Sequence, residues 1–251
     1  ICKGRTAMLH LYWGDGKGKT TAAMGLALRA LGHGRRVVIL QFLKDGSSGE
    51  IEMLRRCGAV VYACPNAKFT WLMTDAERAE ARRTNTRTLQ TILQGSFDLL
   101  VLDEPVDGLD PVMRRQVWSL ILQDVAERGT TVLVSSHNLR ELEDVCDHVG
   151  VMSRGKLLLE HSLSELQDYT VKLQLAFEGA ELPALPQEIK VLHHAQTGRV
   201  HTLICRGSAE DLEQQLAALH PIFIDAVPLS LEEIFIYELG GEDYAIRDIV
   251  L

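Results

Sequence analysis

A glycine-rich run near the start of the chain contains a lysine and two threonines that could bind the phosphates of a nucleotide. The run comprises Trp13, Gly14, Asp15, Gly16, Lys17, Gly18, Lys19, Thr20 and Thr21. Glycines let the backbone turn its N–H groups toward phosphate oxygens, and the positive end of a following helix adds to the attraction. We expect residues 14–21 to bind the nucleotide, with Lys19 as the catalytic phosphate cation and Thr20 as a magnesium ligand.

The residues around this run favour the phosphate-binding interpretation. Residues 7–12 are apolar enough to predict a strand, and residues 22–31 have the composition of a helix that ends at Gly32. Strand, glycine loop and helix together are the context in which such a loop binds phosphate. Trp13 occupies the position where the common motif has its first glycine. A flexible glycine and lysine turn on the surface is the alternative.

Two carboxylates follow a second apolar run. Residues 97–102 predict a buried strand, and Asp103 and Glu104 come directly after it. In a parallel sheet such a strand brings its last residues to the edge where the phosphate loop lies. There Asp103 and Glu104 would serve a metal ion, and Glu104 could also act as a base. The alternative is that both carboxylates only cap a loop.

The composition limits the classes of protein to consider. The chain has 251 residues, 46% of them hydrophobic and 24% charged, and a formal net charge of −8. This balance is typical of a globular protein and argues against nucleic acid as a partner. Because no apolar run approaches the roughly 18 residues that cross a bilayer, we expect a cytoplasmic protein. The five cysteines form no CxxC pair, so neither a disulfide framework nor a zinc site is indicated.

Strands and helices alternate along most of the chain. Further strands are expected at 37–42, 59–63, 130–134, 148–152 and 157–160, with helices at 51–57, 75–93, 112–128 and 139–146. This alternation predicts an α/β fold, namely a doubly wound, mostly parallel sheet of the phosphate-loop NTPase type. We expect this domain to cover residues 1–168.

The pattern of expected strands and helices changes after about residue 168. Alternating strands at 171–177, 189–193, 200–205 and 222–227 surround one helix at 209–219. We therefore expect a small α+β accessory domain at 169–251. Its histidines His193, His194 and His201 could bind a metal, although no carboxylate or cysteine is clearly placed to complete such a site.

Residues 5–104 resemble the ATP:corrinoid adenosyltransferases of the cobalamin pathway. The resemblance rests on the phosphate loop, on residues 25–34, on Gln41, Phe42 and Lys44, on Gly49 and Glu50, on Phe69, Thr70 and Trp71, and on Leu102, Asp103 and Glu104. In that family the reduced cobalt of a corrinoid attacks the ribose 5′ carbon of ATP and releases triphosphate. The resemblance implies that Phe69 and Trp71 face the corrinoid, that Thr20 and Glu104 serve Mg²⁺, and that Lys19 holds the leaving phosphates. Taken alone, Phe69 and Trp71 would more often be core aromatics, and only the surrounding matches favour a corrinoid contact.

Residues 98–251 resemble the second half of an ABC-transporter ATP-binding subunit with its accessory domain. The resemblance rests on residues 99–105, on residues 108–111 and on Ser135, Ser136 and His137. It implies that Glu104 polarises an attacking water, that Asp110 faces a partner subunit and that His137 senses the γ-phosphate. A structural role is the alternative for His137. The glycine-rich signature of that family is missing, because residues 81–94 contain no glycine.

The two resemblances meet near residues 98–105 and leave three functions open. The first is a corrinoid adenosyltransferase that uses ATP and Mg²⁺ and could form a homodimer. The second is an ABC ATPase subunit bound to a membrane permease at the inner membrane face. The third is a nucleotide-binding chimera with neither activity.

Overall fold

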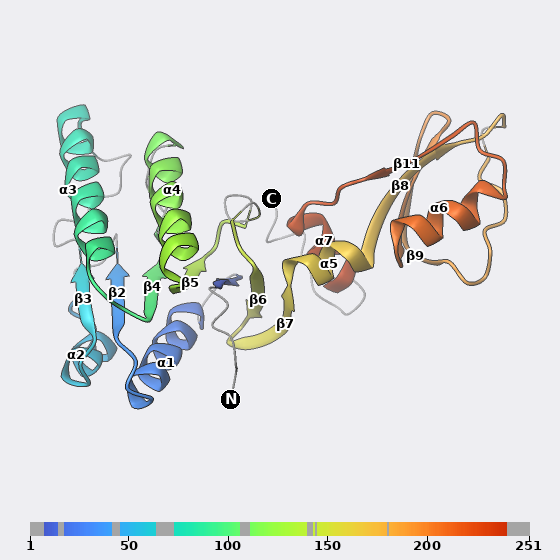
Figure 1. Ribbon diagram of the computed structural model, residues 1–251. Helices are drawn as coiled ribbons and strands as arrows, with labels where there is room; N and C mark the ends of the chain where they lie inside the picture. The colour runs from blue at the N-terminus through green and yellow to red at the C-terminus, as the bar shows by residue number, and fades with distance from the viewer. Residues whose placement is uncertain are drawn as a thin grey trace. The chain divides into compact units, whose positions relative to one another are not determined.

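A computed structural model of the chain describes residues 8–14, 18–41, 46–63, 73–105, 111–139, 143, 145–179 and 181–239. The chain divides into two compact units (Figure 1). The first comprises residues 1–138 and 144–160, and the second comprises residues 139–143 and 161–251.

The first unit is built on a seven-stranded sheet. Its elements are β1 (Leu9–Trp13), α1 (Lys19–Gly32), β2 (Val37–Gln41), α2 (Gly49–Arg56), β3 (Val60–Ala63), α3 (Asp75–Gln94), β4 (Leu99–Asp103), α4 (Pro111–Arg128), β5 (Thr131–Ser136), β6 (His148–Ser153) and β7 (Lys156–Ser162), which runs past residue 160 into the second unit. The strand order is β3-β2-β4-β5-β1-β6-β7. Strands β3 to β6 in this order pair in parallel. The predicted α/β fold with a mostly parallel sheet is therefore confirmed.

Helices cover the two faces of this sheet. Helices α1 and α2 lie on one side and α3 and α4 on the other (Figure 1). Ala23, Ala27 and Ile51 pack against Ile39 and Val101 on the α1 side. All five residues of β2 are buried, which explains why that strand reads as a nearly continuous apolar run.

The register of the strands aligns their last residues at one edge. Asp103, at the end of β4, pairs with Gln41 of β2 on one side and with Ser135 of β5 on the other. Trp13, the last residue of β1, pairs with Ser136. Because the phosphate loop follows β1, this row of residues lies at the same edge as the start of α1.

Strands β6 and β7 form a hairpin with a two-residue turn. Arg154 and Gly155 have φ angles of 48° and 77°, as a type I′ turn requires. The helix predicted at 139–146 falls partly outside the described residues. Residues 139, 143, 145 and 146 are described and are not helical, so the prediction is wrong at these positions.

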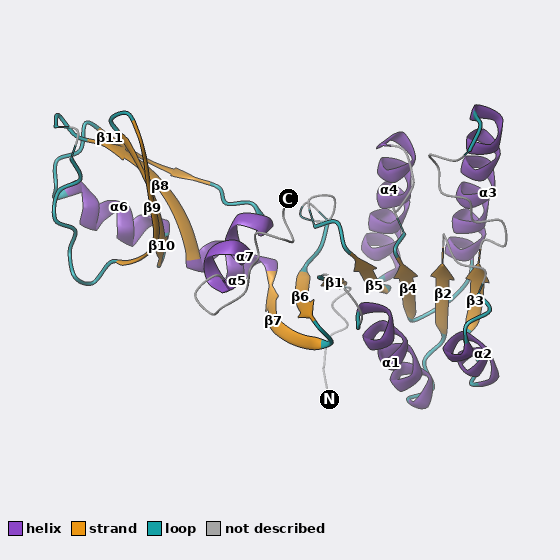
Figure 2. Ribbon diagram, turned by 180° about the vertical axis from the view of Figure 1, so that it is seen from behind, coloured by secondary structure: helices purple, strands orange, loops and turns teal. Residues whose placement is uncertain are grey.

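The second unit contains a four-stranded antiparallel sheet, ordered β11-β8-β10-β9. Its elements are α5 (Leu163–Tyr169), β8 (Thr170–Ala176), β9 (Lys190–Thr197), β10 (Val200–Arg206), α6 (Ala209–Ala217), β11 (Phe223–Val227) and α7 (Leu231–Leu239). Helix α6 lies beside the sheet (Figure 2), where Leu212 and Leu216 pack against Leu173 and Leu203. None of the described helices combines the length and the apolar character that crossing a bilayer requires.

Candidate functional site

The carboxylate of Asp103 is the centre of a buried hydrogen-bond network at the carboxyl edge of the large sheet. Its Oδ1 accepts hydrogen bonds from Thr20 Oγ1 at 2.9 Å and from Ser135 Oγ at 2.6 Å. Its Oδ2 accepts a hydrogen bond from Gln41 Nε2 at 3.0 Å. Asp103 is only 1% exposed. The structure thus brings Thr20 and Asp103, two residues predicted from separate motifs, into direct contact.

Lys19 is the first residue of α1 and lies across the phosphate loop. Its Nζ donates a hydrogen bond to the carbonyl oxygen of Gly14 at 2.6 Å, and the side chain is buried. The ammonium group is therefore held beside the N-terminal end of α1, where backbone N–H groups and the helix dipole attract anions. Thr21 is exposed in the same turn of the helix.

The backbone conformation requires glycine at two positions of the phosphate loop, Gly14 and Gly18. Gly14 and Gly18 have φ angles of 144° and 129°, which other residues rarely adopt. A Cβ on Gly14 would also lie 1.7 Å from the carbonyl oxygen of Met152 in β6. The intervening candidates Asp15, Gly16 and Lys17 lie outside the described residues, as do Phe69 and Trp71.

Glu104 and His137 face each other beyond the ends of β4 and β5. Glu104 Oε2 lies 3.2 Å from His137 Nδ1. The backbone of Glu104 has a φ of 51°, and its N–H donates to the carbonyl oxygen of Ser135 at 2.9 Å. Trp13 Nε1 donates to the carbonyl oxygen of His137 at 3.1 Å. An unusual backbone conformation at a carboxylate beside a histidine is a feature found at functional sites.

Gln41 and Ser135 belong to this site although neither was a predicted site residue. Both are buried polar residues at the ends of apolar strands, which is the signal that could have found them. Gln41 Oε1 is buried and accepts no hydrogen bond within the part of the chain that the structure describes. Hydroxyl, carboxylate and amide oxygens are the ligands that Mg²⁺ prefers, so the residues of this site fit a magnesium ion.

The histidines of the second unit have a different arrangement. His194 Nε2 lies 3.1 Å from His201 Nδ1 with the rings stacked, and His193 stacks on Tyr237 of α7. Among the described residues there is no group of three or more His, Cys, Asp or Glu side chains that could hold a metal ion.

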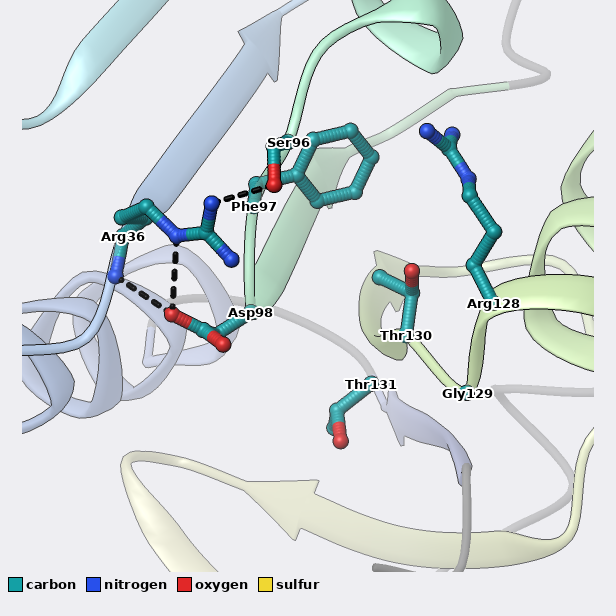
Figure 3. A pocket seen from close by; sticks show the side chains of 8 residues that line it. All are labelled: Arg36, Ser96, Phe97, Asp98, Arg128, Gly129, Thr130 and Thr131. Carbon is teal, nitrogen blue, oxygen red and sulfur yellow. Dashed lines mark hydrogen bonds and ion pairs between the residues drawn. The ribbon is translucent and has the colours of Figure 1, made fainter.

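A pocket lies at the opposite edge of the large sheet, where β4 and β5 begin (Figure 3). It is lined by Arg36, Ser96, Phe97, Asp98, Arg128, Gly129, Thr130 and Thr131. Arg36 Nε forms an ion pair with Asp98 at 3.3 Å, and the Arg128 guanidinium lies 5.4 Å from the Phe97 ring centre. Both arginines thus contact residues that directly precede β4, at the other end of that strand from Asp103.

Comparison with known proteins identifies a family for this chain. Residues 5–164, more than half of the chain, match the family model of the ATP:corrinoid adenosyltransferase BtuR/CobO/CobP. The chain belongs to this adenosyltransferase family. The match continues past the predicted junction near residues 98–105, through β5, β6 and β7.

The chain is also similar to ABC transporter ATP-binding proteins. It is 36% identical over 145 residues to the ABC transporter ATP-binding protein YtrB of Bacillus subtilis, which covers 57% of this chain and 49% of that protein. It is 31% identical over 163 residues to the Nod factor export ATP-binding protein I of Rhizobium johnstonii, covering 62% and 50%. The chain spans about half the length of both relatives.

A solved structure of cbiO1 from Clostridium perfringens, part of the ABC transporter complex cbiONQ, matches with a TM-score of 0.38 and 14% identity. It covers 63% of this chain and 78% of that chain. The similarities to an adenosyltransferase family and to ABC ATP-binding proteins confirm the predicted resemblance to both groups, and the position of the junction stays a prediction. The family model and the ABC relatives both support ATP binding at the phosphate loop of this chain.

Proposed function

We propose that this chain binds ATP with Mg²⁺ at the edge formed by Lys19, Thr20 and Asp103 and transfers the adenosyl group to a reduced corrinoid. The observation that carries the proposal is the direct contact between Thr20 and Asp103 in a chain of the adenosyltransferase family. That contact joins the start of α1 to the acidic end of β4. It provides one place where the phosphates and a metal ion could be held together.

The residues of the chain would bind and orient the phosphates. Lys19 and the N-terminal end of α1 would hold the triphosphate, and Asp103 would fix the position of the Thr20 hydroxyl. Mg²⁺, when bound by Thr20, Asp103 and Glu104, would neutralise charge on the phosphate oxygens. Gln41 and Ser135 would keep the Asp103 carboxylate in one orientation through their hydrogen bonds.

The corrinoid would be the second substrate. The electron pair of the reduced cobalt would form a bond to the ribose 5′ carbon of ATP, and the bond between that carbon and the triphosphate oxygen would break. The triphosphate would leave with the bonding pair, held by Lys19. The resemblance to the family assigns the corrinoid contact to Phe69 and Trp71, which the experiment below tests.

A second candidate function is ATP hydrolysis as an ABC subunit that works with a membrane permease. The 3.2 Å contact between Glu104 and His137 favours it, because these residue types can polarise a water molecule beside a γ-phosphate. The similarity to YtrB supports the same reading. In that case the protein would act in the cytoplasm at the inner membrane face.

Analysis of the reaction products separates the two functions. The purified chain is incubated with ATP, Mg²⁺ and a chemically reduced corrinoid, and the solution is analysed for the cobalt–carbon product, triphosphate, ADP and orthophosphate. We expect the cobalt–carbon product and triphosphate in equal amounts. ADP and orthophosphate without the cobalt–carbon product would overturn the transferase proposal in favour of the ATPase. ATP binding with neither set of products would indicate the inactive chimera.

Variants assign the residues in the same assay. Lys19→Ala is expected to abolish ATP binding and with it all products. Trp71→Ala is expected to reduce formation of the cobalt–carbon product while ATP affinity stays unchanged. Trp118→Ala would be an unsuitable control because Trp118 is buried. The exposed Tyr169→Ala is the matched aromatic control and should leave both properties unchanged. Equal loss of ATP binding in Trp71→Ala would contradict a corrinoid contact.

A further inference from the structure

Strand β7 lies at one edge of the large sheet, next to β6 (Figure 2). Among the described residues no other strand pairs with its outer side. The part of β7 that belongs to the first unit consists of Lys156, three leucines and Glu160. An unpaired strand edge offers a row of backbone donors and acceptors to which another strand can bind.

The hairpin determines which backbone groups of β7 point outward. In a hairpin with a two-residue turn, the residues that flank the turn form a hydrogen-bonded pair. Ser153 and Lys156 flank the turn here, so the backbone N–H and C=O of Lys156 face β6. Because these groups alternate along a strand, those of Leu157 and Leu159 face away from the sheet. No other described segment forms a backbone hydrogen bond with this side of β7.

The side chains of this edge are open to contact with another chain. Leu157 is 51% exposed, and Leu158 and Leu159 are half-buried. Lys156 and Glu160 are exposed, and neither side chain forms a hydrogen bond or an ion pair with another residue that the structure describes. An apolar strand at an open edge is a site where a second chain can associate.

The sequence of this edge is complementary to itself. When two copies pair antiparallel about a twofold axis at Leu158, Leu157 of each copy lies opposite Leu159 of the other. The backbone groups of these two residues face outward, so the pairs can form hydrogen bonds. In the same register Lys156 lies opposite Glu160 of the other copy. Lys156, Leu158 and Glu160 share one face, where opposite charges directly across a strand pair attract each other.

The hairpin is held in place by contacts inside the first unit. A Cβ on Gly18 in the phosphate loop would lie 3.1 Å from Gly155 Cα, and a Cβ on Gly150 would lie 3.4 Å from Leu157 Cδ1. The tight turn at Arg154 and Gly155 fixes the register of β7 on β6. The edge is therefore already formed before another strand binds, which lowers the entropy cost of association.

We propose that two copies of this chain associate through β7, in antiparallel register about Leu158, so that their two large sheets join. The strand at the other edge of the sheet, β3, contains no charged residue and therefore has no such register. A symmetric pair of identical surfaces is the commonest form of homodimer. Because the edge is short, we expect a reversible dimer with an affinity in the micromolar range. The pairing involves no nucleotide, so the dimer should form equally with and without ATP.

The mass in solution tests both the pairing and its register. Sedimentation equilibrium of the intact chain is measured from low to high micromolar concentration, with and without ATP and Mg²⁺. We expect Lys156→Glu to weaken the dimer roughly 5- to 50-fold, because it places like charges opposite each other twice in a symmetric pair. Glu160→Lys should have the same effect. An equimolar mixture of the two variants should dimerise as well as the parent chain, since their charges are complementary.

Lys190→Glu is the matched control. Lys190 is an exposed lysine on β9, an edge strand of the smaller sheet, and this variant should dimerise like the parent chain. The mixture also shows that both variants are folded, because an unfolded chain could not restore the dimer. A parent chain that stays monomeric at high micromolar concentration would overturn the proposal. So would a dimer that the single variants leave intact, a dimer that requires ATP, or a mixture that stays monomeric.

Discussion

The hydroxyl of Thr20 donates a hydrogen bond of 2.9 Å to the carboxylate of Asp103, although 83 positions separate the two residues in the chain. Thr20 lies in the first turn of α1, which follows β1, and Asp103 ends β4; in the sheet order β5 lies between β1 and β4. Ser135 of β5 donates a hydrogen bond to the same carboxylate oxygen, so the intervening strand also contributes to the site. The sheet order thereby turns two local motifs into one site.

Gly14→Ala is expected to destabilise the protein and weaken phosphate binding. The new methyl group would lie 1.7 Å from the Met152 carbonyl oxygen at a φ of 144°. The backbone of the loop or of β6 must therefore shift, and we expect a loss of about 3 kcal/mol or more in the free energy of unfolding. Urea denaturation measures it. Gly25→Ala is the matched control, because Gly25 lies inside α1 with open space around it and should gain about 0.5–1 kcal/mol. Equal effects of the two substitutions would contradict this packing.

The histidine pair between β1 and β6 predicts acid sensitivity. Burial, followed by the nearby His148, lowers the pKa of His10 in the folded protein, against smaller opposing effects of Glu160 and Asp147. Below the unfolded pKa, near 6.5, the unfolded chain binds a proton that the folded chain does not. Stability should therefore be complete above about pH 6.5 and fall as the pH drops toward the folded pKa.

The variant His10→Gln should reduce this fall in the free energy of unfolding between about pH 6.5 and pH 5. Urea denaturation at several pH values measures it. The exposed His33 supplies the control His33→Gln, which should keep the slope of the parent chain. A slope that is the same in His10→Gln and in the parent would refute the role of His10.

Cys205 predicts a difference in thiol reactivity. Burial raises the pKa of the Cys205 thiol to about 11, and the residue is fully buried in the second unit. At pH 8 iodoacetamide should therefore modify the exposed Cys57 and leave Cys205 intact until the chain is unfolded. Peptide mass mapping gives the modification of each cysteine. By the same linkage, stability should fall as the pH rises from about 8.5 toward 11. Equal modification of both cysteines in the folded chain would contradict this burial.

Helix α3 bears on the alternative function. It runs without interruption from Asp75 to Gln94, across the region where an ABC subunit would need a glycine-rich helix start. We therefore expect Glu104→Gln to bind ATP without forming an ATP-dependent dimer. Light scattering with and without ATP and Mg²⁺ measures the mass in solution. A dimer that appears only with ATP in Glu104→Gln, together with loss of hydrolysis, would support the ABC ATPase instead.

The sequence predicts most of the large sheet and the residues that end its strands. Lys19, Thr20, Asp103 and Glu104 could be found because each belongs to a short motif next to an apolar run. Gln41 was not predicted as a site residue because its role depends on β2 lying beside β4, which the order of strands along the chain does not reveal. The contact of the β6–β7 turn with the loop escaped prediction for the same reason.

Two short helices could have been predicted and were not. Ser162 and Glu165 form a capping box at the start of α5. Ser230 and Glu233 exchange the same pair of hydrogen bonds at the start of α7. In both cases a serine is followed three residues later by a glutamate, which is a sequence signal for a helix start. The helix predicted at 139–146 relied on composition and had no such cap.

A double-mutant cycle on Thr20 and Asp103 tests the central claim most directly. Affinities for ATP are measured by calorimetry, with and without Mg²⁺, for the parent chain, Thr20→Val, Asp103→Asn and the double variant. Thr91→Val and Asp98→Asn, which lie away from the site, form the control cycle. If the two residues hold one metal–nucleotide complex, each single variant loses most of the Mg²⁺-dependent affinity, and the double variant loses little more. The coupling should be roughly 0.5–3 kcal/mol with Mg²⁺ and vanish without it. Additive losses, or an ATP affinity that does not depend on Mg²⁺ in the parent chain, would contradict the account.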